Sequence, residues 1–369
     1  MSGMKHSGGS VTTRRTRKIK VAPMTRAVRM ALAASVAALA LGASGGAFAG
    51  NCKAATAMAG DCAVARGIDR APVADLTIVH EGAAAAAIPM VAALAIDEYG
   101  SGDVVIDNAD PITEFDLFAD VTTISGYSSE GNVDITNQAG ADLYAGSVFG
   151  SAIGIYAYAT LGDAAVDNAA DITAISYYGL ADGIFASGAN VDVTNAGAIE
   201  VYGYTWAAGI EAQGDVSATV DNSGDITVVA PGFLQVQDYY GVIGYAPGAQ
   251  AFGIYATGGE GGVDLTNSGT ISVDGGYVAG IEVQSSGDIG VSNSGDIVAG
   301  SGYNASYNNG YYYFYGTQVA TGINATSNGE GAHVGVTNSG DITAEGIFGA
   351  SGIAATSGGL GGTASVDNS

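Results

Sequence analysis

The stretch that decides the fold is VDLTNSGTI, residues 263–271, because its pattern recurs along the chain. Apolar and polar residues alternate in it, so that Val263 and Leu265 lie on one face with Asn267, and Asp264 lies on the other. Alternation with a period of two is typical of a strand with one buried face, whereas a helix needs apolar residues three and four positions apart. The stretch therefore predicts a short strand that ends at a turn.

Copies of this stretch run from about residue 75 to the last residue. The other copies read VVIDNADPI, VDITNQAGADL, AAVDNAADI, VDVTNAGAI, ATVDNSGDI, IGVSNSGDI, VGVTNSGDI and ASVDNS. The central Asn of each copy falls at Asn108, Asn137, Asn168, Asn195, Asn222, Asn267, Asn293, Asn338 and Asn368. A sequence pattern that recurs along most of the chain indicates a solenoid, in which each repeat covers the apolar face of its neighbour.

A second anchor separates the Asn copies. It is Gly-Ile followed by one variable residue and usually Ala, and it begins at Gly154, Gly183, Gly209, Gly253, Gly280, Gly322 and Gly352. The arm from Asn to the next Gly-Ile is lengthened only after Asn222 and Asn293. Insertions confined to one arm are expected when loops leave a solenoid on one side.

These anchors predict an all-β fold, a parallel β-helix of about nine rungs over residues 75–369 that we expect to be right-handed. Asn tolerates the left-handed conformation of a tight corner, and its amide can bond the equivalent Asn one rung away. The sequence thus predicts an Asn ladder through Asn137, Asn168, Asn195, Asn222, Asn267, Asn293 and Asn338. The alternative is a row of cation ligands, although the Asp-bearing Gly-rich nonapeptide of calcium-binding β-rolls is absent.

The two lengthened arms, residues 230–252 and 299–320, are rich in Tyr, Ser, Gly and Asn. That composition is typical of adaptable recognition loops, because Tyr gives contact area at a low entropic cost. The alternative is that the aromatic residues cover an edge of the helix. The candidate binding residues are Tyr239, Tyr240, Tyr303, Tyr307, Tyr311, Tyr312, Tyr313 and Tyr315.

The charge distribution excludes one class of partner. The formal net charge is −25, and every Lys and Arg lies between Lys5 and Arg70. A body without basic side chains repels phosphate, so we expect no nucleic-acid partner. The acidity either keeps an exposed surface soluble or captures divalent cations at acidic turns; calcium is the one candidate cofactor, and the sequence assigns no metal site.

The N-terminal segment predicts export. Basic residues from Arg14 to Arg29 precede an apolar run, and Ala47-Phe48-Ala49 supplies small residues for signal-peptidase cleavage after Ala49. Residues 1–49 are therefore expected to be a signal peptide. Cys52 and Cys62 lie in the following cap segment, residues 50–74, and predict a short disulfide formed in an oxidising compartment.

The basic signal peptide, the V-x-N-x-G-x-I repeats and the scarcity of Cys together resemble the passenger domain of type V secreted autotransporters. The resemblance implies use of an export machinery and a location at the cell surface or outer membrane of a Gram-negative bacterium, or secretion. It also implies a C-terminal β-barrel as the membrane anchor. This sequence shows no barrel and stops within a repeat at Asn368-Ser369, so we expect it to be a partial chain.

Three functions follow from these features. The first is a structural or adhesive passenger that presents the Tyr-rich insertions to a protein or glycan on a host or neighbouring cell. The second is a calcium-dependent extracellular matrix or biofilm component. The third, a β-helix enzyme that degrades polysaccharides, is disfavoured: no Arg follows Arg70 to act as a lyase base, and neither His80 nor His333 accompanies a nucleophile motif. We therefore expect no enzymatic activity.

Overall fold

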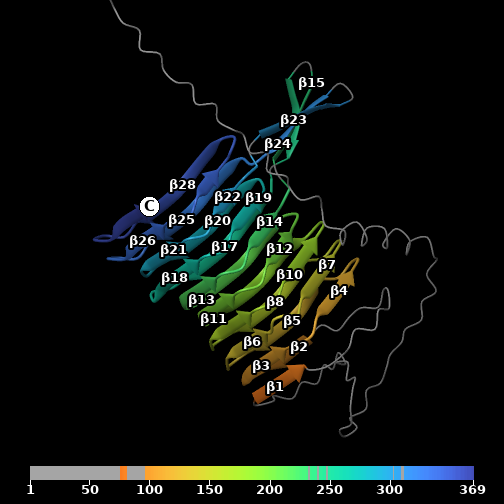
Figure 1. Ribbon diagram of the computed structural model, residues 1–369, viewed down its shortest axis with the longest axis vertical. Coiled ribbons are helices and arrows are strands. Elements are labelled where there is room, and N and C mark those ends of the chain that lie inside the picture. Colours follow the sequence, from red (N-terminus) through yellow and green to blue (C-terminus); the bar gives the residue numbers. More distant parts are fainter. Residues whose placement is uncertain are drawn as a thin grey trace, which may run out of the picture. The chain divides into compact units, whose positions relative to one another are not determined.

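The computed structural model describes residues 75–80, 96–231, 233–238, 241–246, 248–301, 303–308 and 311–369, with side chains over 96–231, 248–301 and 316–369. Within these ranges the chain forms strands joined by turns and has no helix. Strands of successive turns pair in parallel and stack along the solenoid (Figure 1). The prediction of an all-β parallel solenoid is confirmed, whereas the signal peptide, Ala49, Cys52 and Cys62 lie outside the described residues.

Each turn of the solenoid contributes one strand to each of three parallel sheets. Sheet 1 carries the Gly-Ile anchors and consists of β2 (Ile96–Gly100), β5 (Val121–Ser128), β8 (Ala152–Ala159), β11 (Leu180–Asn195), β13 (Trp206–Asn222), β17 (Gln250–Gly258), β20 (Tyr277–Ser285), β25 (Val319–Ser327) and β28 (Gly349–Ser357).

Sheet 2 carries the Asn anchors at the ends of its strands. It consists of the second halves of β11 and β13 together with β1 (Asp75–His80), β3 (Asp103–Asn108), β6 (Val133–Asn137), β9 (Ala164–Asn168), β18 (Gly262–Asn267), β21 (Ile289–Asn293), β26 (His333–Asn338) and β29 (Thr363–Asn368). Because β11 and β13 run through the corner unbroken, sheets 1 and 2 form one 17-stranded sheet.

Sheet 3 has shorter strands that begin at the apolar residue after each Asn turn. It consists of β4 (Ile112–Asp116), β7 (Leu143–Ser147), β10 (Ile172–Ser176), β12 (Ile199–Tyr202), β14 (Ile226–Val229), β19 (Ile271–Asp274), β22 (Ile297–Ala299) and β27 (Ile342–Ala344). These eight strands pair in sequence order as an 8-stranded sheet. Eight complete turns therefore run from β2 to β27, and β28 and β29 begin another.

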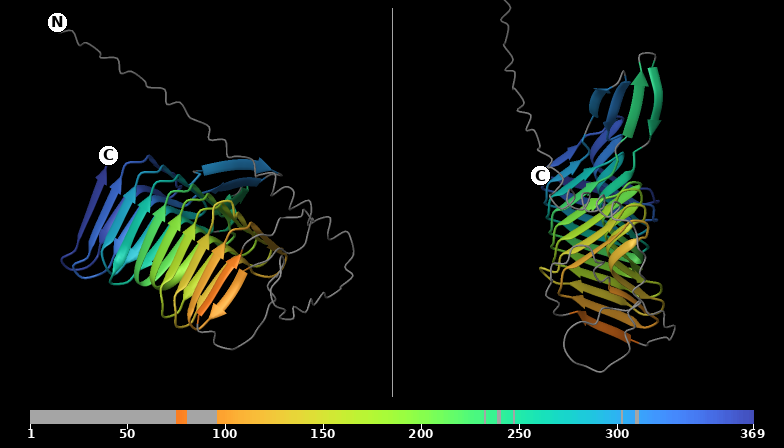
Figure 2. Two further views of the ribbon diagram at one scale, coloured as in Figure 1. Left: turned by 60° about the horizontal axis from the view of Figure 1, so that its bottom comes forward. Right: turned by 90° about the vertical axis from the view of Figure 1, so that its right-hand side faces the viewer.

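The repeated stretch folds as its alternation predicts. In β18, Val263, Leu265 and Asn267 are buried while Asp264 and Thr266 are exposed. The neighbouring turns keep the same register, since Asn222, Asn267 and Asn293 are paired in turn. Figure 2 shows from two further directions that equivalent strands of successive turns lie side by side.

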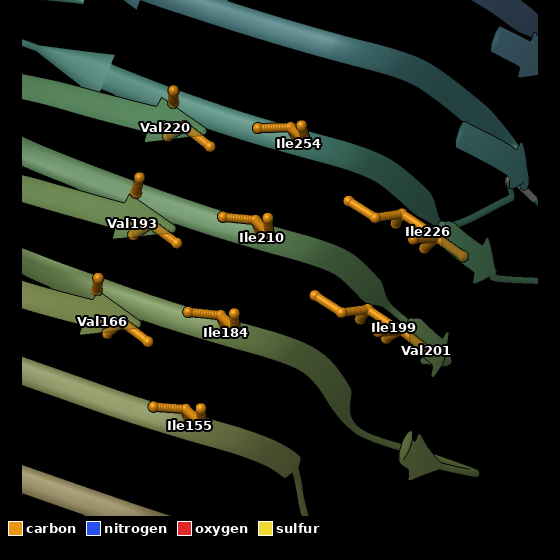
Figure 3. Packing of buried hydrophobic residues seen from close by; sticks show 14 of the residues in the cluster. Ile155, Val166, Ile184, Val193, Ile199, Val201, Ile210, Val220, Ile226 and Ile254 are labelled. Atoms are coloured by element: carbon orange, nitrogen blue, oxygen red, sulfur yellow. The ribbon is translucent and has the colours of Figure 1, made fainter. Parts of the chain in front are cut away.

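The core is built from columns of identical or similar side chains. Figure 3 shows Ile155, Ile184, Ile210 and Ile254 stacked in sheet 1, each fully buried, opposite shorter columns from the other two sheets. Full burial of an aliphatic side chain of this size contributes about 1.5–3 kcal/mol relative to exposure. Equivalent Ile residues lie on paired strands of successive turns, so the strand spacing sets the spacing of the core even where a turn carries an insertion.

From β8 to β25 a Gly precedes the core Ile of sheet 1, and close packing between sheets 1 and 3 requires it. In β5 the same place is held by Thr123. A Cβ on Gly253 would lie 2.3 Å from Cγ2 of Ile271 and 2.5 Å from the carbonyl oxygen of Gly280. A Cβ on Gly154, Gly183 or Gly209 would lie 2.4 Å from Cγ2 of the equivalent Ile and 2.5–2.6 Å from the carbonyl oxygen of the equivalent Gly one turn on. The Gly-Ile anchor therefore marks the place where a strand of sheet 3 approaches the backbone of sheet 1.

Candidate functional site

The regular spacing of the Asn residues becomes a continuous hydrogen-bonded column inside the solenoid. Nδ2 of each Asn donates to Oδ1 of the Asn one turn on, at 2.6–2.7 Å, in every step from Asn108 to Asn368. From Asn108 to Asn338 the side chains are at most 2% exposed. In most turns Nδ2 also donates to the carbonyl oxygen two residues later, as Asn222 does to Gly224 at 2.8 Å.

The hydrogen bonds of this column satisfy the side-chain polar atoms of its Asn residues. An Asn amide offers two N–H donors and a carbonyl acceptor, and the ladder uses both donors and the acceptor within the protein. The oxygen atoms that a cation would need are therefore already occupied by amide donors. Asn137, Asn168, Asn195, Asn222, Asn267, Asn293 and Asn338 all lie in this column.

Recurrent Asp residues have a related mechanical role on the outside of the turns. The Asp225 carboxylate accepts the backbone N–H of Thr270 one turn on at 2.9 Å, and Asp296 accepts that of Asp341 at 3.0 Å. The same bond joins Asp103 to Asn132 at 2.8 Å. Carboxylates in these positions bind successive turns together. Within the described residues, no three His, Cys, Asp or Glu side chains gather as a group that would hold a metal ion.

The two insertions, which the sequence predicts as loops, instead form a small antiparallel sheet. The first holds β15 (Phe233–Asp238) and β16 (Gly241–Ala246), and the second holds β23 (Tyr303–Asn308) and β24 (Tyr311–Gly316). The strand order is β16-β15-β24-β23, so the two hairpins join along β15 and β24. We call this four-stranded unit the insertion sheet (Figure 1).

The insertion sheet brings together six of the eight candidate Tyr residues. Tyr303 and Tyr307 lie in β23, and the other four occupy β24, namely Tyr311, Tyr312, Tyr313 and Tyr315. Tyr239 and Tyr240 lie outside the described residues. In register, Tyr312 pairs with Gln237 on one side and with Tyr307 on the other, which places these three on one face of the sheet.

Alternation along β24 divides its aromatic residues between two faces. Tyr311, Tyr313 and Tyr315 share one face, and Tyr312 and Phe314 share the other. Strands β23 and β24 contain no charged residue, whereas the chain as a whole has a formal net charge of −25. The insertion sheet is thus an aromatic, nearly neutral element on an acidic protein.

Hydrogen bonds at its base tie the insertion sheet to the solenoid. The backbone N–H of Ala249 donates to the carbonyl of Pro231 at 2.9 Å, which closes the first insertion. In the second, the N–H of Ser301 donates to Thr317 Oγ1 at 3.2 Å, and Thr317 donates to Asp274 Oδ1 at 3.3 Å. Both insertions therefore leave the same corner of the solenoid, between sheets 3 and 1.

That corner also carries a ladder of exposed rings in the earlier turns. Phe118 is 77% exposed, and Phe149, Tyr178 and Tyr204 follow it in successive turns. The Phe118 and Phe149 centroids lie 5.5 Å apart with planes at 10°, and Phe149 stacks on Tyr178 at 5.3 Å. This ladder was not predicted, although an aromatic residue after each early sheet 3 strand is a signal for it.

A second feature that was not predicted from the sequence lies on the outer face of sheet 1. Trp206 Nε1 donates to Asp182 Oδ1 and to Glu211 Oε2, both at 3.2 Å, and Gln213 donates to the other oxygen of Glu211. Burial raises the pKa of the Asp182 carboxyl well above its usual range, and the Glu211 carboxylate raises it further. Burial also raises the pKa of Glu211, against the opposing effect of its Gln213 and Trp206 donors.

The sequence does contain a signal for this feature. Glu211 is the variable residue of the Gly-Ile-x-Ala anchor, and the same position holds Tyr156, Phe185, Tyr255 and Glu282 in other turns. Parallel pairing places Phe185, Glu211, Tyr255 and Glu282 in one outward row. The variable position of a repeat is therefore where this solenoid changes its surface chemistry.

His333, which no nucleophile motif accompanies, is exposed. It begins β26, and its Nδ1 lies 2.8 Å from Thr363 Oγ1 of the next turn. Asp182 and Glu211 are 3% and 7% exposed, and both accept a hydrogen bond from the Trp206 indole N–H.

No helix among the described residues is long and apolar enough to span a membrane. Comparison with known proteins gives no relative, since no family model, no curated protein and no solved structure matches this chain.

Proposed function

We propose that this protein is an exported bacterial passenger whose solenoid presents the insertion sheet to a protein or glycan on a host or neighbouring cell. The single observation that carries the proposal is the joining of the two insertions along β15 and β24. Insertions with only a local role would not need to pair with each other across the intervening corner. The pairing places the first hairpin beside the hairpin of the second insertion, which holds six Tyr residues in β23 and β24.

The composition of the insertion sheet supports recognition. Tyr supplies a large contact area with few rotatable bonds, and Asn and Ser supply hydrogen bonds. The neutrality of β23 and β24 also matters, because it lowers electrostatic repulsion where an acidic protein must approach the anionic surface of a cell.

The resemblance to autotransporter passengers supports the export part of the proposal. The basic segment and the small residues around Ala49 are expected to direct the chain across the inner membrane, and the repeats match the passenger architecture. Anchoring in the outer membrane through a barrel belongs to the same proposal. We propose no catalytic role, because the described Asp, Asn and Ser residues mainly connect successive turns.

The test compares binding by two proteins on host-surface and glycan arrays, with and without calcium. In the variant, residues 301–318 are replaced by two Gly residues. Gly300, the equivalent of Asp274, then leads into Val319 through a corner as short as Gly275–Gly276, which joins β19 to β20. This removes β23 and β24 and keeps the path of the solenoid. We expect binding by the wild type and its loss in the variant.

A point variant separates the insertion sheet from the insertion itself. β24 pairs on both sides, so Tyr313→Pro removes a backbone donor and disrupts the sheet without shortening the chain. Its circular dichroism and Trp206 fluorescence should match the wild type if the solenoid is intact. Undiminished binding by both folded variants would overturn the proposal, and binding that requires calcium would favour the matrix function instead.

A further inference from the structure

Sheet 1 carries a patch of carboxylates and aromatic rings in which no positive charge balances the acids. Asp182, Glu211 and Glu282 are buried or half-buried. Their hydrogen-bond donors are the indole of Trp206, the backbone N–H of Ala208 and the amides of Gln and Asn side chains. Buried carboxylates are ordinarily paired with Lys or Arg, because removing a charge from water costs several kcal/mol. The sequence has no Lys or Arg after Arg70, so the solenoid cannot supply that partner.

The arrangement of these groups follows from the register. Glu211, Tyr255 and Glu282 are equivalent residues of three successive turns. With a strand spacing of about 4.8 Å, the two Glu residues flank the Tyr ring one strand away on either side. Both carboxylates act on that ring: burial first, then Glu211 and Glu282, raise the pKa of the Tyr255 hydroxyl.

Ring geometry is an independent sign that this patch differs from the rest of the face. In earlier turns the rings lie almost parallel, with interplanar angles of 6° for Tyr99–Tyr127 and 8° for Tyr156–Phe185, so that they cover one another's faces. Around Trp206 the stacking ends. Trp206 meets Tyr255 edge to face at 83° and Phe252 at 47°, so the rings of this patch form no parallel stack.

We propose that Trp206, Glu211, Tyr255 and Glu282 form a site for an organic cation, an ammonium group on an alkyl stem that lies over Tyr255 between the two carboxylates. An ammonium ion is attracted by the faces of Trp and Tyr rings, and carboxylates accept its N–H donors as charge-assisted hydrogen bonds. The alkyl stem contacts the rings. Asp182 holds Trp206 in place through the indole N–H and is a positioning residue.

The surroundings of the site keep its two Glu side chains fixed. Asn324 Nδ2 lies 3.0 Å from both oxygens of Glu282, and Gln284 Nε2 lies 3.1 Å from one of them. Gln213 holds Glu211 in the same way. These amides orient the carboxylates without neutralising them, so the charge remains available to a ligand. A small amine and a Lys side chain of a partner both carry such an ammonium group, and the experiment below distinguishes these two sources.

Trp206 is the only tryptophan of the protein, so tryptophan fluorescence reports directly on the proposed site. Its fluorescence is recorded while the full chain is titrated with spermidine or with a short oligolysine peptide, at an ionic strength kept constant with NaCl. We expect a saturable change in emission. A response to both ligands indicates a general ammonium site, and a response to the peptide alone indicates a site for a partner's Lys.

Three variants distinguish a site from general charge attraction. Glu211→Gln preserves the shape and the acceptor for Trp206, and it should weaken binding by about tenfold or more. Tyr255→Leu should weaken it by roughly 2- to 30-fold through loss of the cation–π contact. The matched control is Asp264→Asn, which removes the same charge from the exposed face of β18 and should leave binding unchanged.

Several outcomes would overturn the proposal. One is equal weakening by Glu211→Gln and Asp264→Asn, which would indicate nonspecific attraction to an acidic surface. Another is a saturable response to calcium that spermidine and oligolysine do not produce. A third is emission that changes with pH but never with amine, which would mean that a proton is the counter-charge. None of these results depends on the insertion sheet, so this test and that of the adhesive role can fail separately.

Discussion

At the scale of single residues, the Asn column is the most constrained feature of the protein. Asn222 accepts from Asn195, donates to Asn267, and donates again to the carbonyl of its own turn. A change at one rung therefore leaves unsatisfied groups on two neighbours as well.

We expect Asn222→Ala to destabilise the solenoid by about 2–4 kcal/mol, since each buried polar group left without a partner costs about 1–3 kcal/mol. Thr219 lies three residues earlier in β13 with an exposed side chain, so Thr219→Ala is the matched control and should change stability by less than about 0.5 kcal/mol. Urea unfolding followed by circular dichroism measures both. Equal effects of the two substitutions would contradict the assigned role of the column.

The carboxylates of sheet 1 predict an unusual dependence of stability on pH. Burial raises the pKa of Asp182, Glu211, Glu282 and Glu98 in the folded state. The folded protein then binds protons more tightly than the unfolded chain, so this contribution is fully present below the ordinary carboxyl pKa values of about 4 and is lost as pH rises through the raised values.

The melting temperature should therefore be higher at about pH 5 than at about pH 8. A protein whose carboxyl pKa values are lowered by folding shows the opposite order. A double variant, Asp182→Asn with Glu211→Gln, should flatten part of the difference, because neither side chain then titrates. Thermal melts of both proteins across this pH range check the expectation. A wild-type melting temperature that rises toward pH 8 would show that other groups dominate.

At the scale of the structural element, the Gly-Ile anchor explains why the strands of sheet 1 could be located from the sequence. The Gly permits close approach of sheet 3, and the Ile fills the core. Both demands recur in the turns from β8 to β25, so both appear as a repeated motif.

Gly253→Ala should destabilise the protein by about 1–3 kcal/mol, because the added methyl group overlaps Ile271 and the backbone of Gly280. Gly335 provides the control: a Cβ built there meets its nearest atoms only at 3.9 Å, and it lies in β26 of the same solenoid. Gly335→Ala should be neutral or slightly stabilising. Similar losses in both variants, measured by urea unfolding, would refute the packing explanation.

The elements that the sequence did not reveal are those that depart from the repeat. Alternation and the Asn and Gly-Ile anchors predicted the strands and the ladder, because each is a local requirement met in every turn. Pairing of β15 with β24 is a contact between two single-copy segments, which leaves no periodic signal in the sequence. The Trp206 site was missed for a similar reason, since Glu211 and Tyr255 occupy the position that the motif leaves variable. The handedness of the solenoid stays a prediction.

At the scale of the whole molecule, repulsion between acidic side chains lowers the stability of the folded state. No described side chain is a Lys or Arg, so the carboxylates that line each turn repel those of the neighbouring turns. Stacking brings like charges within about 5–10 Å, a range over which salt at physiological strength screens only partly.

Stability should therefore increase when salt is added. Raising NaCl from about 10 mM to 150 mM shortens the Debye length from about 30 Å to about 8 Å and should raise the melting temperature at neutral pH. Potassium chloride should act equally, because the effect is one of screening. A melting temperature independent of salt would mean that the unfolded chain suffers the same repulsion as the folded one.

The insertion sheet also limits how this repeat protein can change its length over evolution. Elsewhere, gain or loss of one whole turn restores every ladder, because the new neighbours present the same Asn, Ile and Gly residues. Between β15 and β24 a whole turn cannot be added or lost in this way. The two hairpins leave corners of the solenoid that are separated by only one other corner, Gly275–Gly276, and this separation lets β15 pair with β24. A duplication there would move the hairpins one further strand apart and break their pairing. Homologous chains should therefore differ in length by whole turns everywhere except in this interval.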